Sequence, residues 1–109
     1  MNSGDRDVGE RTSEAAYRLA LVRELRRQAL AIDPPARIDW FTSHVAQTHM
    51  FPSSPFRERV VLELLAGVSE RLGRSSMPVM ATLVAAENKA RFALEAARST
   101  ETHTKETDS

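Results

Sequence analysis

The chain has 109 residues, of which 41% are hydrophobic and 28% are charged, proportions that are ordinary for one globular domain. Its 15 basic and 15 acidic residues cancel, which argues against a protein whose main task is to coat nucleic acid or an anionic membrane. The absence of cysteine excludes disulfides, thiolate metal ligands and cysteine nucleophiles.

Both ends of the chain are polar. Residues 1–11 contain little apolar surface and residues 99–109 contain none, so we expect a disordered arm and a disordered tail around a single helical domain at 12–98. The amino-terminal segment lacks the hydrophobic stretch of a signal peptide, and no apolar run is long enough to cross a bilayer. The expected protein is cytoplasmic and has no membrane partner.

A first helix is predicted over residues 13–32. Thr12 or Ser13 can cap its amino end, and apolar residues recur behind them at three- and four-residue spacing. The stripe consists of Tyr17, Leu21, Val22, Leu25, Ala29 and Ile32. Asp33 is disfavoured in a helix because Pro34 follows it, whereas Pro34 itself fits the first position of a new helix.

A second helix is predicted over residues 34–50. Its apolar side carries Ile38, Phe41 and Val45, and Phe51-Pro52 breaks it.

A third helix is predicted over residues 55–72, because Ser54 can cap and Pro55 fits the first helical position. Its wide apolar face comprises Phe56, Val60, Val61, Leu64, Leu65, Val68 and Leu72. Leu62 lies off this face, and Gly73 is expected to close the helix in the left-handed conformation.

A fourth helix is predicted over residues 77–98, after the start signal Ser75-Ser76-Met77-Pro78. Its stripe is rich in small residues and runs through Val79 or Met80, Leu83, Ala86, Ala90, Leu94 and Ala97. Val84 and Phe92 lie off that stripe and form a second apolar strip. A helix with two apolar strips usually contacts two neighbours.

Four amphipathic helices joined by short loops predict an all-α fold, a compact four-helix bundle with disordered polar amino- and carboxyl-terminal tails. The wide face of the third helix and the two strips of the fourth exceed what so short a chain is expected to cover. This excess favours a homodimer built around the fourth helix.

The titratable residues form no recognisable catalytic or cofactor-binding pattern. His44 and His49 are five residues apart and point to different sides of a helix, so they do not form a helical zinc pair. We therefore expect no enzyme activity, no metal and no cofactor. Glu87, in or beside the stripe of the fourth helix, is either a buried acid with a raised pKa or, more often in proteins, a residue at the stripe's edge that reaches water or pairs with an arginine from another helix.

Two features leave room for nucleic acid. The arginines at 18, 23, 26 and 27 could form a basic patch on the first helix, although such faces are most often merely solvated. Residues 36–72 could form a helix-turn-helix in which Ser53, Ser54, Arg57 and Arg59 contact DNA. Its turn has no glycine and its second helix is very apolar, so a DNA-binding transcriptional regulator that dimerises through the C-terminal helix is the alternative hypothesis.

The leading hypothesis is a non-catalytic protein–protein interaction or accessory module, which contacts another protein or a second copy through apolar helix surface. Large side chains near loops or off the buried stripes are the candidate contact residues: Trp40, Phe51, Leu62, Val84 and Phe92. Trp40 is more readily expected in the core of one chain. An accessory subunit of a larger enzyme is a second alternative.

Overall fold

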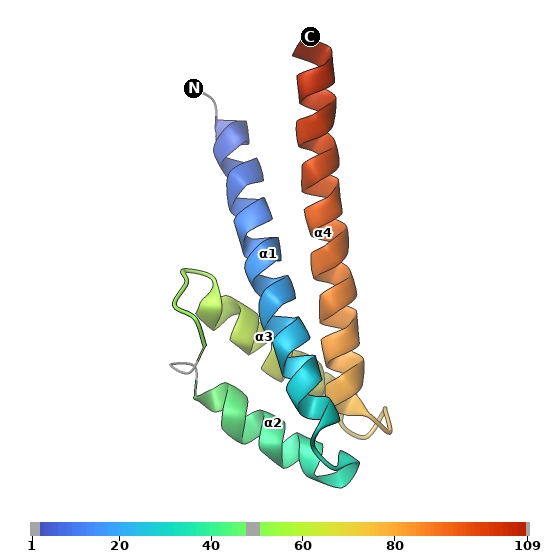
Figure 1. Ribbon diagram of the computed structural model, residues 1–109. Coiled ribbons are helices and arrows are strands. Elements are labelled where there is room, and N and C mark those ends of the chain that lie inside the picture. Colours follow the sequence, from blue (N-terminus) through green and yellow to red (C-terminus); the bar gives the residue numbers. More distant parts are fainter. Residues whose placement is uncertain (1–2, 48–50, 109) are drawn as a thin grey trace.

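The computed structural model describes residues 3–47 and 51–108, with side chains for residues 9, 11–45, 47 and 51–99 (Figure 1). Its elements are α1 (Ser3–Leu30), the short 3-10 helix η1 (Pro34–Ala36), α2 (Arg37–Ala46), α3 (Arg57–Arg71) and α4 (Pro78–Asp108). The described residues contain no strand, and the predicted all-α bundle of four helices is confirmed.

The two longest helices, α1 and α4, lie side by side and run in opposite directions, so that both ends of the chain point the same way (Figure 1). The shorter helices α2 and α3 pack against only one end of this pair. The other end extends beyond them, which gives the molecule its elongated dimensions of 55 × 26 × 23 Å. Along that extension α4 has only α1 to cover it.

The long helices extend into the polar terminal segments. α1 begins at Ser3 rather than at residue 13, so Thr12 and Ser13 lie inside the helix and are not its caps. α4 continues to Asp108 rather than ending at residue 98. Neither segment contains proline, which would interrupt a helix, and their few or absent apolar residues give these helical extensions little to bury. The disorder of these segments in solution stays a prediction.

The helix predicted over 34–50 is shorter than expected and begins differently. The amide of Ala36 donates to the carbonyl of Asp33 at 2.9 Å, and the prolines at 34 and 35 have no amide to donate, so the chain first forms the tight turn η1. α2 ends at Ala46, because Gln47 leaves the helical conformation with ψ at 68°. The predicted end, residues 48–50, lies outside the described residues.

The breakers around α3 behave largely as predicted. Ser54 Oγ accepts a hydrogen bond from the amide of Phe56 at 3.0 Å, and the helix begins two residues later than predicted, at Arg57. Gly73 has a φ of 80°, as expected of the left-handed region. With Leu72 extended and the amide of Arg74 donating to Arg71 at 3.0 Å, this glycine is the third residue of a type II turn.

The start of α4 also follows its sequence signal. Ser75 Oγ accepts a hydrogen bond from the amide of Met77 at 3.1 Å, and Pro78 is the first helical residue. The proline suits this position because its missing amide would have no partner in the first turn.

The core lies where all four helices meet. Nearly all of it comes from the predicted stripes: Leu21, Val22, Leu25, Ala29, Phe41, Val45, Val60, Val61, Leu64, Val68, Val79 and Leu83, joined by Phe51. Burial of each large member contributes about 1.5–3 kcal/mol. Leu72 departs from the prediction and is 47% exposed, because the chain leaves the helix at this residue.

A second, smaller cluster fills the extension of the α1–α4 pair. It consists of Ala15 and Leu19 from α1 and Ala90 and Leu94 from α4. Because only two helices meet here, the buried layer is thin, and the opposite side of α4 stays open to solvent.

Candidate functional site

The outer face of α4 carries a large exposed aromatic side chain. Phe92 keeps 65% of its surface exposed and Val84 keeps 40%. Both residues belong to the second apolar strip predicted for this helix, and the structure leaves that strip facing solvent. A phenylalanine in water forgoes about 1.5–3 kcal/mol of burial free energy, which contact with another surface would recover.

Small side chains border Phe92 along the helix. Ala85 and Ala96, seven residues before it and four after it, are both exposed. A shallow hollow of about 310 Å³ lies between α4 and α1. Its α4 side consists of Ala93, Ala96 and Ala97, and its α1 side of Arg11, Glu14, Ala15 and Arg18. Small residues of this kind let another helix approach the backbone closely.

Leu62 of α3 is a further exposed apolar side chain on the side of the molecule formed by α3 and α4. It is 58% exposed and lines a shallow hollow with Pro55 and Ala66. Ala66 also lines the groove between α3 and α4, together with Ala85, so the exposed side of α3 continues into that of α4. Three glutamates, Glu58, Glu63 and Glu70, are exposed along this side of α3.

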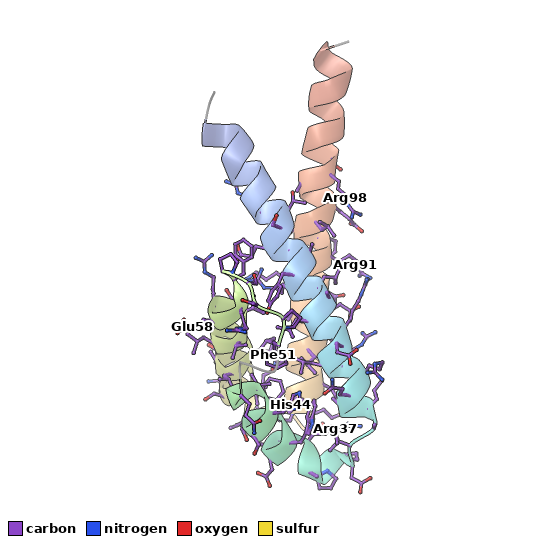
Figure 2. All side chains as sticks on the ribbon, turned by 60° about the vertical axis from the view of Figure 1, so that its left-hand side comes forward. Arg37, His44, Phe51, Glu58, Arg91 and Arg98 are labelled. Atoms are coloured by element: carbon purple, nitrogen blue, oxygen red, sulfur yellow. The ribbon has the colours of Figure 1, made fainter. Side chains whose placement is uncertain are left out.

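The aromatic candidates Trp40 and Phe51 belong to the interior. Phe51 is only 8% exposed, and Trp40 is half-buried against the same core. Figure 2 shows Phe51 between α1 and α3. A buried ring offers little contact surface, so Phe51 is no longer a candidate contact residue. Trp40 packs against the core, as expected from the sequence.

These two rings enclose His44. Its imidazole stacks on Trp40 with ring centres 5.5 Å apart and an angle of 15°, and meets the edge of Phe51 at 5.7 Å and 79°. A pocket of about 350 Å³ opens beside them, lined mainly by the α1 residues Tyr17, Ala20, Leu21, Glu24 and Gln28 and by His44, Phe51 and Pro52. No local sequence signal indicates this pocket, because its walls come from segments that are distant along the chain.

Two polar groups of this pocket, Tyr17 and Glu24, already have partners within the protein. The Tyr17 hydroxyl donates to the carbonyl of Pro52 at 2.8 Å, and burial raises the pKa of this tyrosine against the opposing effect of Arg57. Hydrogen bonds from Arg27 and Gln28 lower the pKa of Glu24 to about 2. Both polar groups thus have structural partners, which suits a role in holding α1 against the Phe51-Pro52 segment.

Three of the four residues proposed for DNA contact form hydrogen bonds or ion pairs within the fold. Ser54 accepts from Phe56 as described above, Arg57 donates to the carbonyl of Phe51 at 3.2 Å, and Arg59 pairs with Glu14 of α1 at 3.2 Å. Ser53 is exposed. The helices α2 and α3 are also joined by residues 47–56, whereas a helix-turn-helix has a turn of about 3–4 residues. The geometry therefore lends the DNA hypothesis no support.

The arginines of α1 do not form an open basic patch. Arg18 is only 9% exposed and contacts Glu63 of α3 at 2.7 Å and Glu14 at 3.3 Å. Arg27 pairs with Glu24. Arg18 was a candidate for an exposed basic patch, but its spacing of four from Val22 puts it on the buried stripe, and this spacing is the signal that the patch hypothesis missed.

Glu87 pairs with arginines of another helix, as the more frequent of its two sequence interpretations predicted. It is 7% exposed, with Oε1 2.9 Å from Nη1 of Arg26 and Oε2 3.8 Å from Nε of Arg23. Oε1 accepts no hydrogen bond of good geometry from any described residue. The contact is therefore mainly Coulombic and ties α4 to α1.

Within the described part of the chain, no group of three or more His, Asp or Glu side chains is arranged to hold a metal ion. His49 lies outside the described residues. None of the described helices has the length and apolar character needed to span a membrane.

Comparison with known proteins gives no relative: no family model, no curated protein and no solved structure matches the chain significantly. The surface chemistry of the chain itself is the basis for the proposal that follows.

Proposed function

We propose that this protein is a non-catalytic interaction module whose contact surface is the outer face of α4, centred on Phe92. The supporting observation is the 65% exposure of this side chain on a helix that no other described element covers on that side. Aromatic side chains are enriched among the residues that dominate binding energy at protein interfaces, provided that the partner removes them from water.

The surroundings of Phe92 support an interface more than an isolated exposed ring. The neighbouring Ala85 and Ala96 have small side chains, so a second helix can pack close to the backbone of α4 there. Val84 extends the apolar strip toward the start of α4. Polar and charged side chains, Asn88, Lys89, Arg91 and Glu95, border the strip and are exposed. An apolar centre with a polar rim is the usual anatomy of a protein–protein contact.

The proposal is tested by placing a photo-crosslinking amino acid, p-benzoylphenylalanine, at position 92 in the native host. Leu30 is a matched control, because it is 63% exposed but lies at the far end of α1. We expect a discrete protein adduct from position 92, to a second copy or to another chain, and none above background from position 30. Equal or absent adducts at both positions would contradict the proposed contact surface.

A further inference from the structure

The outer face of α4 has a helical repeat that suits pairing with another helix. Its residues follow one another at intervals of three or four and comprise Ala81, Ala85, Asn88, Phe92, Ala96 and Ser99; we call this set the α4 seam. Phe92 is the one large apolar side chain in the seam, and small or short side chains stand on both sides of it. Such a seam matches the narrow apolar stripe of helices that pack along their length.

The charges beside the seam are self-complementary. Arg91 and Glu95 are both exposed and stand one turn apart on the same flank of α4. Figure 2 shows Arg91 and Arg98 on the side of α4 away from Glu58 of α3. Arg91 donates to Asn88 at 3.2 Å, while Glu95 makes no ion pair with any described residue. One exposed acid and one exposed base on the same flank can therefore pair with their copies.

The direction of pairing follows from these charges. If two copies of α4 lie antiparallel with Phe92 next to the twofold axis, Arg91 of each copy faces Glu95 of the other. If the helices lie parallel, the flank that carries Arg91 and Glu95 faces the opposite flank of the partner, where Lys89 and Ala96 lie, so no Arg91–Glu95 pair forms between the copies. Antiparallel packing also brings the two phenylalanine rings together at the axis, where they exclude water from each other.

The geometry points to a second copy of this chain as the partner, an inference that rests on the proposed function. The two copies dock through the α4 seam in an antiparallel, twofold-symmetric arrangement with Phe92 beside the axis. The two Phe92 rings supply the apolar centre of the contact. The two Arg91–Glu95 pairs set its direction. Exposed pairs of this kind contribute little affinity singly, so they act mainly on register and orientation.

The absence of cysteine in the chain makes a direct test simple. Phe92→Cys introduces one thiol, and two copies of it would lie close enough for a disulfide, which needs Cα atoms within about 7 Å. Ser99→Cys is the control on the same seam: antiparallel copies of residue 99 lie about 20 Å apart at 1.5 Å per residue, whereas parallel copies are adjacent. We expect the oxidised purified protein to form a covalent dimer from position 92 only. Dimer at both positions, or at neither, would overturn the arrangement.

Charge reversal tests the same arrangement with Phe92 intact. Sedimentation equilibrium should show that Arg91→Glu and Glu95→Arg each weaken self-association, about tenfold, and that the double variant restores it. An unchanged association in both single variants, or a monomer in the unmodified protein at all concentrations, would overturn the self-pairing. If the purified chain is monomeric but position 92 still crosslinks to a different protein in the host, self-pairing is wrong while the proposed function stands.

Discussion

Gly67 of α3 lies directly against Thr82 of α4: a Cβ atom built on the glycine would come within 2.8 Å of the threonine Cγ2. Thr82 is 4% exposed and has little room to move. Arg71 Nη1 bridges the two helices, because it donates to the carbonyl of Gly67 at 3.1 Å and lies 3.5 Å from Thr82 Oγ1. The missing side chain at position 67 therefore sets how closely α3 approaches α4.

This contact predicts that Gly67→Ala destabilises the protein although alanine favours helix formation. The gain in helix propensity is up to about 1 kcal/mol, whereas overpacking typically costs about 1–3 kcal/mol. We expect a net loss of about 1 kcal/mol in the free energy of unfolding, measured by urea denaturation followed through the single tryptophan.

Thr82→Ser provides the matched rescue, because it removes Cγ2 and keeps the hydroxyl that faces Arg71. In the double variant the alanine at 67 has room, so the two substitutions should couple favourably by about 1 kcal/mol. If Gly67→Ala alone is stabilising, the spacing of α3 and α4 is not set by this pair.

Two leucines of opposite burial give a second prediction. Leu25 is 0% exposed at the centre of the core, and Leu62 is 58% exposed on α3. The same change to alanine should cost about 2–5 kcal/mol at position 25, because it leaves a cavity, and less than about 0.5 kcal/mol at position 62. Similar losses at both positions, in the same denaturation experiment, would show that Leu62 is covered in the folded protein.

The interior of the fold follows closely from local sequence signals. Proline after Asp33 and serine before Phe56 or Met77 act over a few residues, and the stripe through Val22 and Leu25 needs only the helical period. These signals are local in the chain, so they can be interpreted without knowing how the helices pack.

The features that sequence reasoning missed depend on packing between distant segments. The burial of Phe51 requires the chain after α2 to fold back over α1, and that of Arg18 requires acids on α1 and α3 to converge on it. The start of α1 at Ser3 lies in a polar stretch with two glycines, whose composition had predicted a disordered arm instead of a helix. For the α4 surface the sequence was more informative, since the helical period already placed Phe92 off the buried stripe. Phe92 is then exposed if no other element covers that side of α4.

The ion pair between α1 and α4 gives a third prediction. Glu87→Gln removes the charge that faces Arg26 and Arg23, whose side chains are 40% and 56% exposed and can therefore be solvated by water. The expected cost is about 1 kcal/mol, well below the roughly 3–5 kcal/mol of breaking a fully buried pair. Glu87→Met, which fills the same space with apolar atoms, should be close to neutral in urea denaturation. A loss of several kcal/mol for Glu87→Met would show that the charge itself holds the helices together.

The last prediction concerns alkaline pH and the single tyrosine. The pKa of Tyr17 is raised above its ordinary value of 10.0, chiefly because burial disfavours the charged phenolate, with Arg57 acting in the opposite direction. The folded protein therefore holds this proton more tightly than the unfolded chain does. Its contribution to stability is complete below about pH 10 and is lost as the pH rises through the pKa of the folded state.

Ionisation would also remove the hydrogen that Tyr17 donates to the carbonyl of Pro52. Tyr17→Phe lacks both effects and should cost about 0.5–1.5 kcal/mol at neutral pH through the lost hydrogen bond. Urea denaturation of both proteins between pH 8 and 11 separates the effect of Tyr17 on the free energy of unfolding from the effects of the other titrating groups, because the two proteins share those groups. The unmodified protein should lose more stability over this range than the variant, so that their difference narrows. A constant difference across the range would show that Tyr17 titrates alike in the folded and unfolded states.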